Sequence, residues 1–292
     1  MGNDGSSRSD RSDRSVLITG CSTGIGRVTA EGLLRSGWKV TATARRVETI
    51  KDLGDAGARV LPLDVTDEAS MSGAVAAVQE ADGAVDVLIN NAGYGLQGPV
   101  EEFSMEEVRR QFETNVFGLI RMCQLVLPGM RRRGWGRIVN LSSIGGKVTF
   151  PGGGFYHGTK HAVEAISDAL RFEVRPFGVK IIVVEPGTVL TPFGDTAVAS
   201  ISDGGPYAAF KEGLADTVKG AYDGPMARMA ITPEKVAAVI EKAISKRRPR
   251  TRYPVGLPAR MGIAMKRITP DRMFDAVLRS QFRSAEPPSR SA

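Results

Sequence analysis

The chain has 292 residues, of which 42% are hydrophobic and 24% are charged. This composition is ordinary for a globular protein with enough apolar material for one core, and no run of 18 apolar residues is available to span a membrane. The net charge of +7 is uneven, because residues 246–292 carry twelve Lys and Arg against three Asp and Glu, or +9, and the rest sums to −2. Proteins that coat nucleic acid carry their basic residues on the folded body, so nucleic acid is not a predicted partner.

The cysteines and the first residues bear on the cellular compartment. Cys21 and Cys123 lie far apart and in no metal-ligand spacing, which is typical of a reducing cytoplasm rather than of a disulfide framework. Residues 1–14 are polar and lack the apolar core of a signal peptide. We therefore expect a cytoplasmic protein that begins with a disordered polar leader.

Short hydrophobic runs alternate with helical patterns along the chain. Strands are expected at residues 15–19, 38–44, 60–63, 85–89, 137–141 and 180–184. Helices are expected at residues 24–36, 68–80, 105–133, 155–174 and 233–246. This alternation predicts a doubly wound parallel sheet, a Rossmann-like α/β fold in three layers. We expect one domain over residues 15–253 with a substrate lid at about 191–231, and a basic, partly helical extension over residues 254–292.

The first turn of this pattern has the composition of a phosphate-binding loop. Residues 19–26 read Thr-Gly-Cys-Ser-Thr-Gly-Ile-Gly and join the first strand to the first helix. A Cβ atom in such a turn obstructs the approach of backbone N–H groups to a pyrophosphate, and glycines at 20, 24 and 26 remove that obstruction. We predict a dinucleotide site here, although the spacing differs from the more familiar Gly-x-Gly-x-x-Gly.

The end of the second strand indicates which dinucleotide binds. An NAD enzyme usually places Asp or Glu about 20 residues after the glycine turn, against the ribose 2′-hydroxyl. Arg45 and Arg46 stand there instead, and nothing acidic precedes Glu48. A guanidinium pairs with a 2′-phosphate that a carboxylate repels. NADP(H) is the predicted cofactor and NAD(H) the alternative, and the sequence leaves open which arginine reads the phosphate.

A tyrosine and a lysine four residues apart supply a candidate acid and base. On a helix, Tyr156 and Lys160 share one face. A tyrosine titrates near ~10, and a neighbouring ammonium group favours its phenolate, so we expect Lys160 to lower the pKa of Tyr156. The pair then protonates a carbonyl oxygen or deprotonates an alcohol. Ser142 and Ser143 end a strand shortly before Tyr156, and a hydroxyl there can hydrogen-bond the same substrate oxygen.

With Asn-Asn-Ala-Gly at residues 90–93 and Pro-Gly at 186–187, these motifs resemble, in order, those of the short-chain dehydrogenase/reductase family over residues 16–244. The resemblance implies an oxidoreductase that moves a hydride between a nicotinamide and an alcohol or carbonyl carbon. The implied catalytic residues are Asn115, Ser143, Tyr156 and Lys160. Ser143 fits the family spacing better than Ser142, and Asn115 resembles the family residue that holds a water in a proton relay through Lys160.

The same resemblance assigns the cofactor contacts. Asp64 is implied to contact the adenine, Asn90 to line the adenosine side and brace the central strand, and Lys160 to hydrogen-bond the nicotinamide ribose. Backbone groups around Pro186 are implied to hold the carboxamide. The full predicted set is Gly20, Ser22, Thr23, Gly24, Ile25, Gly26, Arg45, Arg46, Asp64, Val65, Asn90, Ala92, Gly93, Tyr156, Lys160, Pro186, Gly187, Val189 and Thr191.

The segment over residues 191–232 is expected to decide the substrate. It is rich in Gly, Ala and Ser, which suits a lid that closes over the site. Its large apolar residues either wall the substrate site or pack the lid down, and they are Phe193, Tyr207, Phe210, Met226 and Met229. The predicted substrate contacts are Ser143, Tyr156 and Phe193. With Phe150, Phe155 and its C-terminal extension, the chain resembles the branch of 17β-hydroxysteroid and retinol dehydrogenases, which implies a bulky apolar, steroid-, retinoid- or lipid-like substrate.

Two other functions remain open. One is a 3-oxoacyl-(acyl carrier protein) reductase whose acidic carrier docks on basic residues such as those at 131–133, although we interpret these arginines as complementing a helix dipole. The other is a non-catalytic dinucleotide-binding sensor on the same fold. By analogy with the family we expect a homodimer or homotetramer formed through the helix at 105–133 and the helix that carries Tyr156.

Two further patterns receive ordinary interpretations. His157 and His161 have the spacing of a helical zinc pair, but no third ligand is evident nearby and no metal is predicted. In the basic tail, apolar residues recur at helical spacing beside cations such as Arg272, and they are Met273, Phe274, Val277, Leu278 and Phe282. We expect this stripe to pack on the protein itself, with contact to an anionic membrane surface as the minor alternative.

Overall fold

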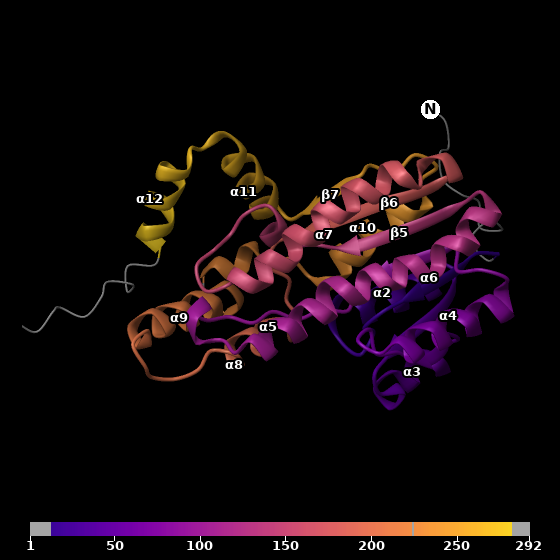
Figure 1. Ribbon diagram of the computed structural model, residues 1–292, viewed down its shortest axis with the longest axis horizontal. Coiled ribbons are helices and arrows are strands. Elements are labelled where there is room, and N and C mark those ends of the chain that lie inside the picture. The colour runs from indigo at the N-terminus through magenta and orange to yellow at the C-terminus, as the bar shows by residue number, and fades with distance from the viewer. Residues whose placement is uncertain (1–12, 224, 282–292) are drawn as a thin grey trace, which may run out of the picture.

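A seven-stranded parallel sheet forms the centre of the molecule (Figure 1). The computed structural model describes residues 13–223 and 225–281. The strand order is β3-β2-β1-β4-β5-β6-β7, and each neighbouring pair is parallel. The strands are β1 (Ser15–Ile18), β2 (Lys39–Ala44), β3 (Arg59–Pro62), β4 (Val87–Asn90), β5 (Gly136–Leu141), β6 (Val179–Pro186) and β7 (Arg252–Val255). The predicted Rossmann-like fold is confirmed.

Helices cover both faces of this sheet and so complete three layers. The helices α2 and α10 pack together on one face, whereas α4, α6 and α7 cover the other. The helices of the domain are α2 (Gly24–Arg35), α3 (Lys51–Asp55), α4 (Glu68–Asp82), α5 (Met105–Phe112), α6 (Gly118–Arg133), α7 (Gly154–Glu173), α8 (Phe193–Ala199), α9 (Ala208–Asp223) and α10 (Pro233–Ser245). Two more follow β7, namely α11 (Leu257–Ile268) and α12 (Asp271–Gln281).

The sheet has a hydrophobic core on each of its faces, because successive side chains of a strand point to opposite faces. In β1, Val16 and Ile18 belong to the core beneath α2 and α10, whereas Leu17 belongs to the core beneath α4 and α6. All three side chains are fully buried. Successive residues of a strand face opposite sides of the sheet, so a strand covered on both faces is apolar at every position. Both cysteines lie inside these cores as free thiols, and burial raises the pKa of each to about 12.

An ion pair between a buried carboxylate and an exposed arginine closes the edge of the sheet where the strands begin. The Asp86 carboxylate, which is 2% exposed, accepts a hydrogen bond from the backbone N–H of Ser15 at 3.0 Å and pairs with Arg133 Nη1 at 2.7 Å. Arg133 ends α6, where positive charge also complements the helix dipole. Of the arginines at 131–133, at least Arg133 therefore has an intramolecular ion-pair partner.

The helix predicted over residues 105–133 is interrupted. A π-helical turn, Glu113–Phe117, separates α5 from α6 without ending the helical path. Such turns insert one extra residue into a helix and often lie at functional sites. Here the turn carries the buried side chain of Asn115.

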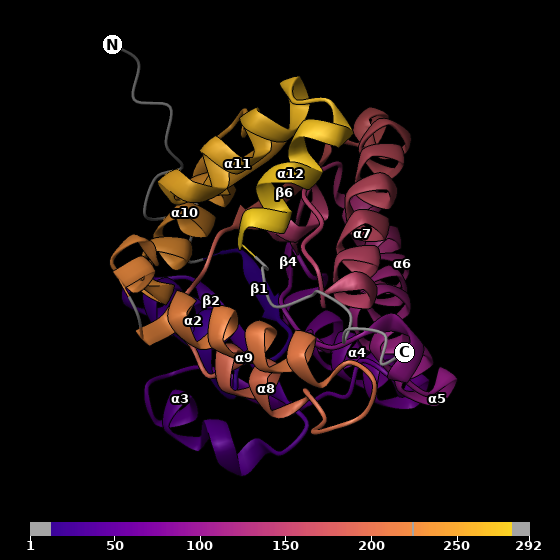
Figure 2. The ribbon, with the colours of Figure 1, turned by 90° about the vertical axis from the view of Figure 1, so that its left-hand side faces the viewer.

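The segment from residue 191 to 232 is more regular than its composition predicts. It contains α8, α9 and the 3₁₀ turn Pro225–Met229. Helix α9 has glycines at 213 and 220, which lower helix propensity, but packing of one apolar face outweighs that cost. Figure 2 looks at the end of the molecule where the strands terminate and shows α8 and α9 across from α11 and α12.

Three elements near the sheet edges were not expected from the sequence. They are the 3₁₀ turn Val47–Ile50, the helix α3 that follows it, and β7. The predicted domain boundary at Tyr253 falls inside β7, because the pairing with β6 continues to Val255. Residues 1–12 of the predicted leader and Phe282 of the tail lie outside the described residues. Across the part of the chain that the structure describes, no helix is long and apolar enough to cross a bilayer.

Candidate active site

A cavity of about 970 Å³ lies at the carboxyl-terminal ends of the strands. In open parallel sheets ligands bind at this edge, at the point where the strand order reverses, which here lies between β1 and β4. Most of the residues predicted from the sequence line it together. They are Gly20, Ser22, Thr23, Gly24, Ile25, Arg45, Asp64, Val65, Ala92, Gly93, Ser143, Tyr156, Lys160, Pro186, Gly187, Val189, Thr191 and Phe193. Four predicted residues do not line it, namely Gly26, Arg46, Asn90 and Asn115.

The glycine loop is held in shape by the end of β4. Asn91 Nδ2 donates to the carbonyl oxygens of Thr19 and Gly20, at 2.9 and 2.8 Å. In return the Thr19 hydroxyl accepts from the backbone N–H groups of Asn91 and Ala92, both at 3.0 Å. Gly20 and Gly24 have φ values of 73° and 60°, which a residue with a Cβ rarely adopts. Contacts within the protein therefore fix the backbone conformation of the loop.

The structure gives Gly26 a different role from the predicted one. A Cβ at this position would lie 2.4 Å from Asn91 Nδ2 and 2.4 Å from the Gly20 carbonyl oxygen. Gly26 does not face the cavity. Its missing side chain instead lets α2 pack directly on the loop, so the predicted contact with the dinucleotide is corrected to a contact within the cradle.

Asn90 also points away from the cavity. It is 4% exposed, and its Nδ2 donates to Asn140 Oδ1 at 3.0 Å and to Cys123 Sγ at 3.3 Å. Asn140 in turn donates to Ser167 Oγ at 2.9 Å. This buried chain ties β4 to β5 and to α7, which fits the expected bracing of the central strand. The expected contact with the adenosine does not fit, because the side chain that reaches the cavity at this turn is that of Asn91.

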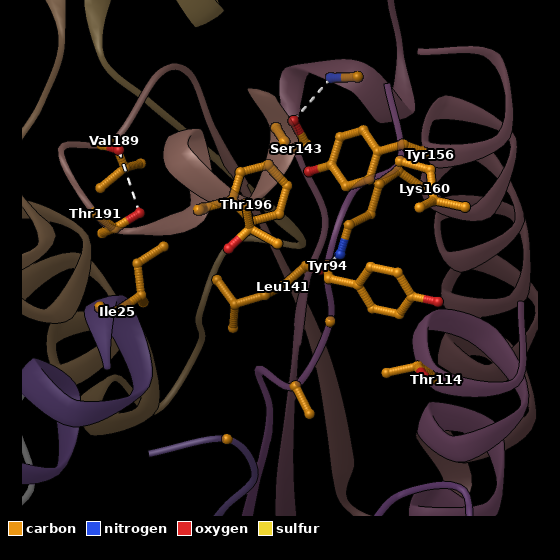
Figure 3. Close-up of a pocket in the computed structure, with 18 of the residues that line it drawn as sticks. Ile25, Tyr94, Thr114, Leu141, Ser143, Tyr156, Lys160, Val189, Thr191 and Thr196 are labelled. Atoms are coloured by element: carbon orange, nitrogen blue, oxygen red, sulfur yellow. Dashed lines mark hydrogen bonds between the residues drawn. The ribbon is translucent and has the colours of Figure 1, made fainter. Parts of the chain in front are cut away.

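Tyr156, Lys160 and Ser143 converge on one part of the cavity (Figure 3). Tyr156 and Lys160 share a face of α7, and Lys160 Nζ lies 5.8 Å from the centre of the Tyr156 ring. Lys160 Nζ donates to the carbonyl oxygen of Leu141, the last residue of β5, at 2.8 Å. Two residues further on, Ser143 Oγ accepts from the backbone N–H of Gly145 at 3.0 Å. The hydroxyls of Ser143 and Tyr156 point into the same space.

The electrostatics of this pair differ from the expectation. Burial raises the pKa of Tyr156 to about 12, and the neighbouring Ser143 hydroxyl opposes that rise only in part. Burial also lowers the pKa of Lys160 to about 8, opposed by the charge of Glu164. Desolvation penalises the charged form of both groups, and it is the largest cause of both pKa shifts. The pKa of Tyr156 therefore moves in the direction opposite to the predicted depression by Lys160, and Tyr156 is a phenol at neutral pH.

Asn115 stands behind Tyr94 and Lys160 rather than at the cavity wall. Its Nδ2 donates to the Tyr94 carbonyl oxygen at 2.8 Å and to Thr159 Oγ1 at 3.1 Å. Its Oδ1 accepts from the Tyr94 backbone N–H at 3.1 Å. A Cβ on Gly93 would lie 3.0 Å from this oxygen and 3.8 Å from Lys160 Nζ. Only a glycine at 93 leaves the space between the asparagine and the lysine open.

One face of α9 and the start of α8 supply an apolar wall. Phe193 stacks at a tilt on Tyr156, with ring centres 5.5 Å apart. The wall residues of α9 were missed by the sequence analysis and are Leu214, Thr217, Val218, Ala221 and Tyr222. Their spacing of three and four residues is the signal that could have found them. Of the expected wall residues, Tyr207, Phe210 and Met229 do not line the cavity, and Met226 lies outside the described side chains.

The paired histidines have separate environments. His157 is 6% exposed and lines the cavity, and its Nδ1 accepts from the backbone N–H of Phe150 at 3.3 Å. Burial lowers the pKa of His157 to about 4, so its ring is neutral at pH 7. His161 Nδ1 lies 2.9 Å from the His157 carbonyl oxygen. Among the described residues no group of three or more His, Cys, Asp or Glu is arranged to hold a metal ion.

The fold and this site define a class, the dinucleotide-dependent oxidoreductases. The family model described as short chain dehydrogenase matches residues 14–201, and the chain belongs to that family. It is 39% identical over 268 residues to the 3-ketodihydrosphingosine reductase of Bacteroides thetaiotaomicron, covering 90% of this chain and 96% of that protein.

Solved structures share the whole fold. A short-chain dehydrogenase from Streptomyces avermitilis superposes with a TM-score of 0.77 at 33% identity, covering 94% of this chain and 98% of that one. A serine dehydrogenase complexed with NADP+ gives 0.72 at 29% identity over 83% and 94% of the two chains. A Burkholderia phymatum dehydrogenase in complex with NAD gives 0.74 at 27% identity over 94% and 98%. The cofactor class is therefore a nicotinamide dinucleotide.

Substitution of Gly26 by alanine tests whether the cradle depends on close packing. We expect Gly26→Ala to weaken binding of NADPH and NADH alike by at least about tenfold, because the new Cβ collides with the Asn91 amide and the Gly20 carbonyl and displaces the loop. Fluorescence titration of the bound nicotinamide measures this. Gly32→Ala is the matched control, since it lies in the same helix and a Cβ there meets only Arg35 Nη2 at 4.0 Å. Equal affinities of the two variants would contradict the packing role of Gly26.

Proposed function

We propose that the protein is an NADP(H)-dependent enzyme that interconverts an alcohol with a ketone or aldehyde on a bulky apolar substrate. The observation that carries this proposal is the convergence of Tyr156, Lys160 and Ser143 at one part of a cavity whose other part is the glycine cradle. The cradle fits a pyrophosphate, because Gly20 and Gly24 face the cavity and a Cβ on either would narrow it. When bound, the nicotinamide supplies or accepts the hydride.

The chain's own residues have separable tasks in this proposal. The Tyr156 phenol donates its proton to the carbonyl oxygen in the reducing direction and takes it back in the oxidising direction. Ser143 hydrogen-bonds the same substrate oxygen and orients it. Lys160 supplies a positive charge close to the phenol as it loses its proton. Asn115, through its contacts with Tyr94 and Thr159, positions the backbone around the route by which Lys160 recovers a proton.

The preference for NADP(H) rests on Arg45. It lines the cavity just beyond the end of β2, whereas the neighbouring Arg46 does not. Both side chains are exposed, so the Arg45 guanidinium is free to turn toward a phosphate on the ribose. Asp64, which also lines the cavity, accepts from the backbone N–H and hydroxyl of Thr66 at 2.9 and 2.8 Å. These bonds hold it in a turn at the end of β3, where it would meet the adenine rather than the 2′-phosphate.

The proposed substrate class follows from the wall opposite Tyr156. Leu96, Phe150, Phe193, Leu214, Val218 and Tyr222 all line this part of the cavity. A relative named for a keto lipid, 3-ketodihydrosphingosine, supports a lipid-like ketone as the class. The alternative of a carrier-protein reductase is less well supported, because Arg133 of the expected docking cluster is paired with Asp86 and donates to the Asp82 carbonyl oxygen.

Members of this family commonly form oligomers, and we extend that to this chain. Phe117, at the junction of α5 and α6, is 52% exposed, and Phe172 near the end of α7 is 63% exposed. Both lie on the helices through which we expect a homodimer or homotetramer to form. Burying two such rings in a symmetric contact would remove substantial apolar surface from water.

Cofactor preference is tested by replacing Arg45 and Arg46, one at a time, with alanine. Arg45→Ala is expected to weaken NADPH binding by about tenfold or more, the usual worth of a charged hydrogen bond, and to leave NADH binding unchanged. Arg46→Ala is the matched control and is expected to change NADPH affinity less than threefold or so. Nicotinamide fluorescence on both variants measures this. Tighter NADH than NADPH binding by the wild type would refute the preference.

The pH dependence of turnover tests the roles of Tyr156 and Lys160. Ketone reduction needs the phenol, which persists to about pH 12, and a charged lysine, whose pKa is about 8. We therefore expect the rate at saturating NADPH to be level below pH 7 and to fall about tenfold per pH unit well above pH 8. Arginine stays charged at these pH values, so Lys160→Arg, although slower, should lose this decline. The same decline in both proteins would assign it to another group.

The apolar wall is tested on α9. We expect Val218→Asp to raise the KM for a hydrophobic ketone by at least about tenfold, because a carboxylate in this wall is desolvated by an apolar substrate. Binding of NADPH should be unaffected. Lys219→Asp places the same group on the next residue of α9, which does not line the cavity, and should leave the KM within about twofold. Steady-state kinetics with a matched pair of short and long ketones gives both values. An unchanged KM in Val218→Asp would mean that substrate does not contact α9.

A further inference from the structure

The C-terminal pair of helices has its large apolar side chains on the outside. In α11, Leu257, Met261, Met265 and Ile268 are 68%, 62%, 40% and 83% exposed. Their spacing of four, four and three residues puts them in one stripe along the helix. In α12, Met273 is 63% exposed. Isolated exposed apolar residues are ordinary, but a continuous stripe marks a surface that contacts something apolar.

Two small residues on the opposite face of α11 pack against residues that line the cavity. Ala259 is fully buried, and its Cβ lies 3.6 Å from where a Cβ on Gly187 would be. A Cβ on Gly262 would lie 2.9 Å from Ile144 Cδ1. Gly187 and Ile144 both line the cavity. The stripe therefore lies on the outer side of a helix whose inner side contacts two residues that line the cavity. Figure 2 shows α11 at the same end of the molecule as α8 and α9.

The expectation that the tail stripe packs on the protein itself holds for Phe274. Phe274 is 3% exposed and lies under Lys266, whose Nζ is 4.7 Å from its ring centre. Met273, its neighbour in the same predicted stripe, faces outward. Phe274 therefore packs α12 against α11, whereas the apolar stripe of α11 and Met273 remain exposed.

Cations surround this apolar surface. Arg260 and Arg267 flank the stripe of α11, Arg272 and Arg279 lie on α12, and all four are exposed. Lys266 pairs with Asp271 at 2.7 Å, and the only other acidic residue between 257 and 279 is Asp275. The two helices thus combine protruding Leu, Ile and Met side chains with a net positive charge. An apolar stripe bordered by basic residues fits the interface of an anionic bilayer, where the apolar chains enter the acyl boundary and the guanidinium groups meet phosphates.

We propose that α11 and α12 form a docking surface for anionic phospholipid membranes, which brings the cavity to the bilayer surface where apolar substrates are dissolved. The docking itself stands on the exposed stripe and its charges. Only its purpose, the delivery of a lipid-like ketone, rests on the proposed function. Helix α11 contacts Ile144 and Gly187, which line the cavity. A membrane bound to the outer side of α11 and α12 would therefore lie close to the catalytic residues.

Vesicle binding tests this proposal without any measurement of turnover. The full-length protein is floated with vesicles of phosphatidylcholine alone or with added phosphatidylglycerol. We expect binding to the anionic vesicles, weaker binding at high salt, and little binding to the neutral ones. The double variant Met261→Glu/Ile268→Glu should reduce the partition coefficient by at least about tenfold. The matched control is Met229→Glu, because Met229 is 54% exposed, lies outside α11 and α12 and does not line the cavity.

The alternatives give different results. Wild-type protein that fails to bind anionic vesicles, or a double variant that binds as well as the Met229→Glu control, overturns the proposal. Sedimentation in the absence of lipid then identifies the other occupant, since a dimer that the double variant dissociates would assign the stripe to a second copy of the chain. Unchanged NADPH affinity in the double variant shows that it is folded and keeps a failure of membrane binding separate from a failure of the proposed function.

Discussion

All seven strands run in the same direction, and this constraint places every candidate functional group at one edge of the sheet. Parallel pairing in register means that β1, β4, β5 and β6 end side by side. The residues that follow them are those of the glycine loop, Asn91, Ser143 and Gly187. Backbone groups at these strand ends have no further strand partner, so side chains of the neighbouring turns bond them: Asn91 Nδ2 donates to the carbonyl oxygens of Thr19 and Gly20, and the Thr19 hydroxyl accepts from the Asn91 backbone N–H. The cradle is therefore made by the turns that follow neighbouring strands and by the bonds between those turns.

Burial then decides the protonation states. Tyr156 and Lys160 are close enough to interact, but each is withdrawn from water, and the cost of desolvating a charge acts on both. Burial lowers the pKa of Lys160 to about 8, and the charge of Glu164 opposes that fall. The tyrosine stays a phenol. In the proposed mechanism this is the form that gives a proton to a carbonyl oxygen.

The surroundings of the site are built from helices that lie outside the regular alternation of strand and helix. Helix α9 turns Leu214 and Val218 toward the cavity, and α11 sets Ala259 and Gly262 against the residues on the other side of it. Small residues let α11 approach closely, which is why its large residues face outward. The same packing thus encloses the substrate region and exposes the apolar stripe, so enclosure of the cavity and the proposed membrane contact have one structural cause.

The sequence by itself determined the first six strands, the main helices, the glycine loop and the Tyr156–Lys160 pair, because these depend on local periodicity and on short spacings within one element or turn. It did not place α9, since its glycines lower the local helix signal and only packing over the cavity compensates for them. Tertiary structure alone decided that Gly26 serves the cradle from behind, that Asn91 rather than Asn90 reaches the cavity, and that α11 turns its large residues outward. It also decided the pKa of Tyr156. Each of these outcomes depends on atoms brought together from distant parts of the chain, and desolvation in particular is set by everything that surrounds a group rather than by its neighbours in sequence.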